Sequence, residues 1–169
     1  FKHNNITILV INDYSKDNTK KKLEQIKKFF KFKILNNNKN IGYGGVQKKA
    51  YKYAIKNKFD YVIMLHGDGQ YTPKKLNKII FELKKNKYDG VFGTRMWSAY
   101  SAIKGGMPLY KYIGNIFLTT IQNFILRTSM SEFHSGYRSY KVSSLKGINL
   151  NKFTNDFHFD TQIIIEFIK

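Results

Sequence analysis

The stretch from His66 to Gln70, which has an aspartate at its centre, comes just after an apolar segment. The segment Tyr61 to Leu65 is typical of a buried strand, and His66, Asp68 and Gln70 follow it. Open α/β sheets bind ligands at the carboxyl ends of their strands, so these side chains are placed for metal or ligand chemistry. A polar turn is the alternative, because Asp-Gly is also common turn chemistry.

Two further apolar segments, residues 6–11 and 32–35, end in similar polar or glycine-rich stretches. The first is continuously apolar and β-branched, as buried parallel strands are. The residues that follow them are Asn12 and Asp13 after the first, and Asn40, Gly42 and Gly44 beyond the second. Three such strand ends within about seventy residues predict one shared cleft.

Helical patterns separate these strands and define the fold class. Apolar residues recur at helical spacing in three stretches, residues 19–30, 46–54 and 76–83. Thr72 can cap the third helix, and Pro73 suits its first turn. A fourth strand is expected at residues 90–92, and the alternating segment after Arg138 is expected to form another. Strands that alternate with helices predict a three-layer α/β domain with a mostly parallel sheet.

Composition narrows the class of protein. A chain of 169 residues has the size of one domain, and 42% hydrophobic residues fit a folded core. Cysteine is absent, which excludes disulfides and thiolate metal sites. The net charge is +19, yet of thirty basic residues only Arg95, Arg127 and Arg138 are arginine. Nucleic-acid recognition favours clustered arginine, so a basic nucleic-acid-binding domain is the lesser alternative.

The longest apolar region, Leu109 to Leu126, contains polar residues and is too interrupted for a membrane span. An amphipathic helix is expected there. It either packs into the core or rests on a membrane surface, with Lys104 and Lys111 beside it to attract anionic lipid. We expect a cytoplasmic protein, in the second case peripheral at the inner face of the membrane.

Five motifs in this chain resemble those of family-two glycosyltransferases of the GT-A fold, and the closest resemblance is to the dolichol-phosphate mannosyltransferase branch. Residues 11–19 resemble V-D-D-x-S-x-D-x-T, residues 40–44 resemble N-x-G-x-G, residues 66–70 resemble D-x-D-G-Q, residues 93–95 resemble G-S-R, and residues 132–138 resemble D-x-x-x-G-F-R. Each motif alone is weak evidence. Five in the right order across nearly the whole chain are strong evidence.

The resemblance implies inverting transfer of a sugar from a nucleotide-diphosphosugar donor to a lipid phosphate or a glycan, in the synthesis of cell-envelope glycans. It also implies a divalent ion, Mn²⁺ or Mg²⁺, which offsets the charge that develops on the diphosphate as the sugar departs. Asp68 would be the principal ligand of this ion and Gln70 the second. The nucleotide-binding residues would be Asn12 and Asp13 at the base or ribose, with Asn40, Gly42 and Gly44 forming the wall beside it.

Three further residues take roles from the same resemblance. Arg95 and Arg138 would hold phosphate oxygens, because a guanidinium group matches their geometry; an arginine paired with a carboxylate is the alternative. Glu132 would take the proton of a hydroxyl acceptor. With a lipid-phosphate acceptor no base is needed, and Glu132 would orient Arg138 or a substrate hydroxyl. A surface glutamate at a helix end is the alternative.

The chain departs from the family pattern in two places. His66 replaces the first acid of the third motif; a neutral imidazole can bind manganese but suits magnesium poorly, and a hydrogen-bonded loop histidine is the alternative. The family's first strand does not precede Phe1. We therefore expect a single domain, residues 1–169, that lacks its amino-terminal strand and is truncated at both ends. The rival function is a catalytically inactive nucleotide-sugar-binding relic.

Two segments are expected to border the cleft. Residues 98–108 are either a mobile lid or an ordinary connection. In residues 156–160 aromatic and polar residues alternate, which predicts a strand-like segment that closes the acceptor side with Asp160 facing inward.

Overall fold

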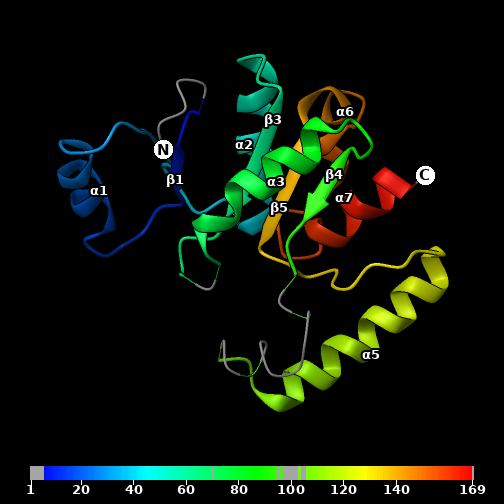
Figure 1. Ribbon diagram of the computed structural model, residues 1–169. Coiled ribbons are helices and arrows are strands. Elements are labelled where there is room, and N and C mark those ends of the chain that lie inside the picture. Colours follow the sequence, from blue (N-terminus) through cyan, green and yellow to red (C-terminus); the bar gives the residue numbers. More distant parts are fainter. Residues whose placement is uncertain (1–5, 70, 95, 97–102, 104–105, 169) are drawn as a thin grey trace.

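The strands form two small sheets in the computed structural model, which describes residues 6–69, 71–94, 96, 103 and 106–168 (Figure 1). In the first sheet β1 (Leu9–Asn12) pairs in parallel with β2 (Lys33–Asn36). The second has the order β3 (Tyr61–Leu65), β5 (Tyr137–Lys141), β4 (Gly90–Phe92). β5 runs antiparallel to both neighbours, so β3 and β4 point the same way.

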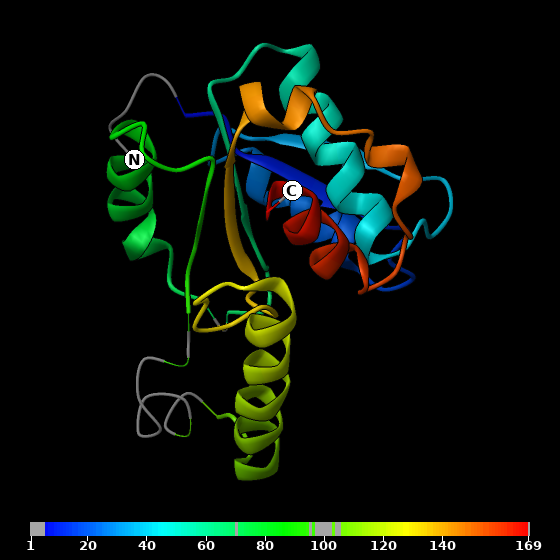
Figure 2. The same cartoon turned by 90° about the vertical axis from the view of Figure 1, so that its right-hand side faces the viewer.

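Helices cover both faces of the three-stranded sheet. α3 (Leu76–Lys84) lies on one face, and α2 (Tyr43–Lys56) and α7 (Phe159–Ile168) lie on the other (Figure 2). α6 (Val142–Lys146) follows β5 directly and contacts α2. Single turns of 3₁₀ helix occur at η1 (Pro73–Lys75) and η2 (Leu150–Lys152). α1 (Thr19–Lys27) and α5 (Leu109–Leu126) lie away from these layers (Figure 1).

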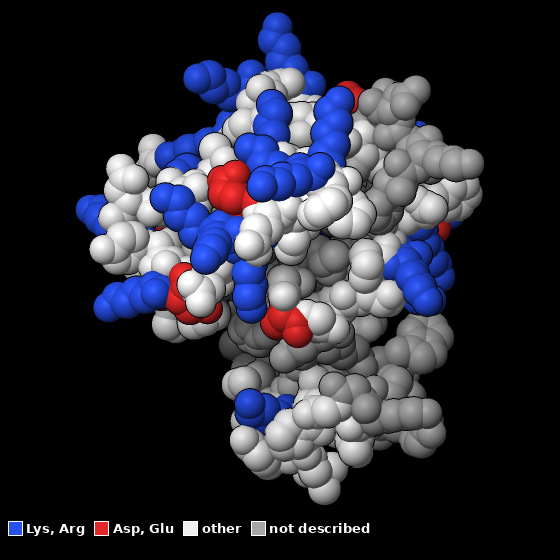
Figure 3. Space-filling model, turned by 90° about the vertical axis from the view of Figure 1, so that its left-hand side faces the viewer, with Lys and Arg blue, Asp and Glu red and all other residues white. Residues whose placement is uncertain are grey.

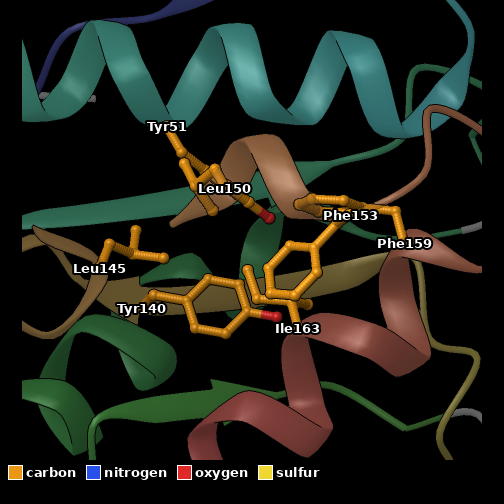
Figure 4. Close-up of a cluster of buried hydrophobic side chains, with 7 residues drawn as sticks. All are labelled: Tyr51, Tyr140, Leu145, Leu150, Phe153, Phe159 and Ile163. Atoms are coloured by element: carbon orange, nitrogen blue, oxygen red, sulfur yellow. The ribbon is translucent and has the colours of Figure 1, made fainter. Parts of the chain in front are cut away.

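Two apolar clusters hold the sheet between its helices. The larger cluster, shown in Figure 4, consists of Tyr51, Tyr140, Leu145, Leu150, Phe153, Phe159 and Ile163. The smaller cluster, beneath α3, consists of Tyr71, Ile79, Leu83 and Tyr137. Successive side chains of a strand point to opposite faces, so β5 supplies Tyr137 to one cluster and Tyr140 to the other. Each large apolar side chain contributes roughly 1.5–3 kcal/mol on burial, which stabilises β5 at the centre of the sheet.

The α/β class is confirmed, but the prediction of a mostly parallel sheet is wrong for the three-stranded sheet. There β5 is antiparallel to β3 and to β4. Along the chain β5 comes after β3, β4 and α5. In the sheet it lies between β3 and β4. An alternating pattern shows which side chains share a face and carries no information on strand direction, which explains the error.

The expected helix starts are partly observed. Thr72 caps η1 by accepting a hydrogen bond from the Lys74 amide, and Pro73 occupies the first position, as predicted. α1 forms as well, and the Asp17 carboxylate accepts the Thr19 amide at 3.0 Å. None of the residues of α1 is buried, however. Of its apolar side chains, Leu23 is half-buried and Ile26 is exposed.

Residues 156–160 do not form the expected strand-like segment. The Asp156 carboxylate accepts the His158 amide at 2.9 Å, and the Asp156 carbonyl accepts the Phe159 amide. These bonds turn the chain into α7, which begins at Phe159. A short aspartate competes for backbone donors, and this local capping overrides the alternating pattern.

α5 does not pack into the core, so that alternative is wrong. Its only buried residue is Thr119, and Figure 1 shows the helix extending below the layered part of the domain. The residues that the membrane hypothesis needs to be uncovered, Ile113, Phe117 and Ile121, are all exposed. Among the described residues, no helix has the length and apolarity that a membrane crossing requires.

Candidate active site

The carboxyl ends of β3 and β4 meet the amino end of β5 at one edge of the three-stranded sheet. Leu65 pairs with Tyr137 and Phe92 pairs with Arg138, so the segments that follow β3 and β4 lie beside the segment that precedes β5. α2 reaches the same edge, because the Tyr43 hydroxyl lies 3.1 Å from His66 Nε2. The structure thus gathers segments that are up to about a hundred residues apart in the chain at one edge.

Asp13 joins the first motif to the second. Its carboxylate accepts hydrogen bonds from Asn37 Nδ2 at 2.8 Å, from the Ile41 amide at 3.0 Å and from the Gly42 amide at 3.1 Å. The side chain is half-buried and holds the loop that leads into α2. A contact with a nucleobase or ribose stays a prediction for this residue.

Asn12 lies beneath the site and not in it. The residue is 6% exposed, and its amide group donates to Asn36 Oδ1 at 3.0 Å while accepting from the Ser15 amide at 3.2 Å. A carboxylate could not donate to Asn36, which gives a physical reason for an amide at this position. The expected contact with the nucleotide does not fit this buried position, because both ends of the amide are bonded to protein.

The glycines of the second motif make room for the protein's own chain. Gly42 has φ +80°, and a Cβ there would lie 2.5 Å from the Asn155 carbonyl oxygen. A Cβ on Gly44 would lie 2.7 Å from Phe159 Cβ. The Asn155 carbonyl also accepts the Gly44 amide at 2.8 Å, at the start of α2. Protein therefore fills the space that a side chain on Gly44 would take, and a place for this residue in a nucleotide wall stays a prediction.

A cavity of about 550 Å³ lies between the second motif and the start of α7. Its lining consists of Asp13, Asn40, Gly42, Tyr43, Asn155, Asp156 and Phe157. The rings of Tyr43 and Phe157 are stacked, with centroids 4.7 Å apart. Neither aromatic residue is expected at the site from the sequence. Tyr43 occupies a variable position of its motif, and Phe157 belongs to a segment whose alternating pattern predicts a strand.

A neighbouring cavity of about 630 Å³ borders the other side of residues 153–155. It is lined in part by Lys48, Lys49 and Lys52, and none of the expected site residues lines it. Burial and the nearby Lys52 lower the pKa of Lys48, whose ammonium group donates to Asn155 Oδ1 at 2.8 Å. Lys48 thus connects α2 with the segment before α7.

His66 is held on several sides. Its Nε2 atom contacts the Tyr43 hydroxyl, and its ring meets the rings of Tyr43 and Tyr71 edge-on. A Cβ on Gly136 would lie 2.6 Å from His66 Nδ1, so only glycine admits the ring in this position. The structure therefore shows a well-packed histidine whose Nδ1 lies 3.9 Å from Asp68 Oδ2.

His66 Nδ1 and Asp68 Oδ2 are 3.9 Å apart. Two ligands that are each about 2.1 Å from an ion lie at most about 4.2 Å apart, so one divalent ion could reach both atoms, and its binding by this pair stays a prediction. Both side chains are partly exposed, at 30% and 44%, and so are accessible to a ligand. No cluster of three or more histidine or acidic side chains exists in the described part of the chain. Protein residues there would supply only part of the coordination.

Arg138 forms a buried ion pair. Its side chain is 1% exposed and lies 3.1 Å from Asp160 Oδ2. It also donates to the carbonyl oxygens of Phe133 and Ser135, at 2.6 and 2.8 Å. The expected contact with phosphate does not fit this arrangement, because the guanidinium group is enclosed and bonded to protein. The alternative of a carboxylate-paired arginine describes what the structure shows, and Asp160 faces Arg138 in the interior.

Glu132 is buried and is not the surface glutamate of the alternative reading. The residue is 3% exposed, and its two carboxylate oxygens accept from Thr94 Oγ1 at 3.3 Å and from Asn115 Nδ2 at 3.4 Å. Thr94 belongs to the fourth motif and Asn115 to α5. Glu132 thus connects the sheet edge with the exposed apolar helix.

Two other expected site residues, Gln70 and Arg95, lie outside the described residues, as does most of the segment 98–108.

Tyr43 is the residue that links these parts. Its hydroxyl donates to Asp160 Oδ2 at 2.9 Å, and burial together with that carboxylate raises the pKa of Tyr43 well above its usual value. The hydroxyl therefore keeps its proton at physiological pH. Tyr43 connects the buried Arg138–Asp160 pair with His66 at the edge of the sheet.

The described part of the chain is a layered α/β domain with carboxylate and imidazole groups where its strands end, the position at which open α/β sheets bind ligands. The model of the family described as Glycosyl transferase family 2 matches residues 2–148. The chain belongs to this family, and membership implies a GT-A fold.

Three curated relatives, all from methanogenic archaea, are similar to this chain. A UDP-N-acetylglucosamine–dolichyl-phosphate N-acetylglucosaminyltransferase of Methanococcus voltae is 28% identical over 85% of this chain and 62% of its own length. Two uncharacterised proteins of Methanocaldococcus jannaschii are 29% and 30% identical, each over 83% of this chain and over 62% and 56% of their own lengths. The chain thus spans only about three-fifths of these relatives.

Proposed function

We propose that this protein transfers a sugar, with inversion, from a nucleotide-diphosphosugar donor to a lipid phosphate at a membrane surface. The observation that carries the proposal is the meeting of His66, Asp68 and the segment from Glu132 at one edge of the three-stranded sheet, to which Asp13 is joined through the loop before α2. Family membership supports glycosyl transfer. The name of the relative from Methanococcus voltae supports a lipid-phosphate acceptor, and with it the dolichol-phosphate branch.

The donor would lie along the carboxyl ends of the strands. In this proposal the nucleoside part takes the region of Asp13 and Asn40, and the diphosphate lies by Asp68. His66 and Asp68 would hold a divalent ion, as members of the family generally do, and this ion would stabilise charge on the departing diphosphate. Manganese is the preferred ion, because imidazole nitrogen suits it better than magnesium. Gln70 and Arg95 remain expected donor contacts.

The acceptor would approach from the side of α5. This helix has no acidic residue, and its exposed side chains are mostly large and apolar. Among the described residues in the lower part of Figure 3, at the height of α5, most are uncharged, whereas basic side chains crowd the part above. An apolar helix beside a strongly basic body suits the surface of an anionic membrane. Glu132 would then act at the junction between donor and acceptor.

The direct test of the proposal is a transfer assay. The protein is incubated with Mn²⁺, a long-chain polyprenyl phosphate in detergent, and each of a set of radiolabelled nucleotide sugars. Lipid-soluble label from at least one donor is the expected result. Donor binding without transfer to lipid phosphate or to glycan would instead favour the inactive nucleotide-sugar-binding relic.

A second prediction concerns binding to membranes. Phe124, on α5, is 86% exposed, and burial of an exposed phenylalanine contributes roughly 1.5–3 kcal/mol. We therefore expect Phe124→Ser to weaken flotation with phosphatidylglycerol vesicles by about tenfold. Flotation of the unchanged protein should also weaken as salt increases.

The matched control for that prediction is Phe29→Ser. Phe29 is 81% exposed but lies just after α1, away from α5. Its substitution should leave flotation unchanged. An equal loss for the two variants would show that general surface apolarity and not α5 drives binding.

A third prediction uses Glu132→Gln to identify the acceptor class. With a lipid-phosphate acceptor the loss should be less than about tenfold and appear mainly in the KM for the acceptor, because no proton has to be removed. A fall in kcat of roughly a hundredfold or more would instead show that Glu132 is the base for a hydroxyl acceptor. Glu82→Gln, which changes a glutamate paired with Lys85 on α3, serves as the control and should leave transfer unchanged.

A further inference from the structure

The Tyr43 hydroxyl lies between two groups that both compete for its single proton. It is 2.9 Å from Asp160 Oδ2 and 3.1 Å from His66 Nε2. A carboxylate can only accept hydrogen bonds, whereas a neutral imidazole nitrogen can either donate or accept. The direction of the bond to His66 therefore depends on how Asp160 is satisfied.

Asp160 is surrounded by donors. Arg138 forms an ion pair with it at 3.1 Å, and Gln47 Nε2 donates to its other oxygen at 2.8 Å. The Tyr43 hydroxyl donates to this carboxylate as well, so Asp160 accepts from all three side chains. The hydroxyl proton of Tyr43 is then committed to Asp160, and only the lone pairs of its oxygen remain for His66.

We propose that Tyr43 is a positioning residue that holds neutral His66 with its proton on Nε2, leaving the lone pair of Nδ1 for a divalent ion shared with Asp68. A histidine that binds a metal through one nitrogen commonly donates its other N–H to a neighbouring group, which fixes both tautomer and ring orientation. Here that neighbouring group is Tyr43, supported in turn by Asp160 and Arg138. The tautomer follows from the hydrogen bonds alone; the ion rests on the proposed function.

Packing supports the same orientation. Phe157 stacks on the Tyr43 ring, and the missing side chain of Gly136 makes room for the face of the His66 ring. The Gly136 amide itself donates to the Tyr71 hydroxyl at 2.9 Å, so the backbone beside the imidazole is also held. His66 replaces an acid that needs no tautomer control. A histidine in this place needs a partner such as Tyr43 to present a lone pair.

The tautomer can be read without metal, donor or activity. Long-range ¹H–¹⁵N correlation spectra of protein labelled at histidine distinguish the two neutral forms, and the signals of His66 are assigned by their loss in His66→Asn. At a pH above the usual histidine range, the unchanged protein should show His66 with its proton on Nε2. A proton on Nδ1 would overturn the inference outright.

Tyr43→Phe keeps the ring that stacks on Phe157 and removes only the hydroxyl. In this variant His66 should show a mixture of tautomers, and affinity for Mn²⁺ alone, measured by calorimetry, should fall by roughly ten- to a hundredfold. The control, Tyr53→Phe, removes a hydroxyl on the same helix that accepts from Lys33 at 2.8 Å, and it should change neither quantity.

The outcomes separate this inference from the proposed function. Equal Mn²⁺ affinity in the unchanged protein and in Tyr43→Phe would overturn the inference even if the protein transfers sugar. A proton on Nε2 together with weakened Mn²⁺ binding in Tyr43→Phe would support it even if no sugar transfer is found, and that result would count against the proposed function alone.

Discussion

Asp68→Asn is expected to lower sugar transfer by roughly a hundred- to a thousandfold while leaving the fold intact. The carboxylate is 44% exposed and lies 3.9 Å from His66 Nδ1. In the proposed function the two side chains would share a divalent ion, and asparagine keeps the shape of Asp68 but removes the charge that would attract this ion. The ion would offset charge on the leaving diphosphate, so both kcat and metal affinity should fall.

The measurement is transfer of label from the donor as a function of Mn²⁺ concentration. Transfer in the presence of a chelator gives the activity without free metal. Asp89→Asn is the control, because Asp89 is a well-exposed carboxylate near Lys141, at the amino end of β4 and away from the site. That variant should retain full activity. Undiminished transfer by Asp68→Asn, or by the unchanged protein in chelator, would refute the assignment of the metal site.

Arg138→Met should lower the free energy of unfolding by about 3–5 kcal/mol, because it leaves Asp160 buried without its partner. Domains of this size are stable by only about 5–15 kcal/mol, so the loss is a large share of the total. The carbonyl oxygens of Phe133 and Ser135 also lose their donor. Methionine has a similar length, so loss of charge and hydrogen bonds, not of volume, should dominate.

Urea denaturation of the two variants Arg138→Met and Arg127→Met tests this prediction. Arg127 is exposed at the end of α5 with φ +51°, and methionine is no more strained there than arginine, so this control should change stability little. If Arg138 instead held phosphate, Arg138→Met would stay stable and lose affinity for substrate. That result would restore the role that the family motif implies.

Much of the architecture is readable from local patterns. The apolar run at residues 61–65, the Thr72–Pro73 start and the helix over residues 109–126 all appear where they were expected. These features depend on periodicity and on capping chemistry, which act over a few residues. The five motifs likewise identified the family, because their order along the chain is visible without a structure.

The strand direction of β5 and the exposure of α5 could not be predicted from local patterns. Alternation at residues 137–141 does not distinguish parallel from antiparallel pairing. An apolar helix looks the same in sequence whether it packs into the core or stays exposed, and only the positions of the other elements show that α5 lies outside. Both properties depend on contacts with distant parts of the chain.

The same distinction between local pattern and tertiary contact applies to the candidate site. Residue types alone mark Asp13, His66, Asp68 and Glu132 as able to do chemistry, because carboxylate and imidazole groups can bind metal ions and transfer protons. Whether each side chain faces a ligand depends on its tertiary neighbours. Arg138 carries the motif of a phosphate-binding residue, yet Asp160, twenty-two positions later, encloses it in an ion pair. Tyr43 carries no signal in sequence, and its role exists only because folding brings α2, α7 and the end of β3 to within hydrogen-bond distance of one another.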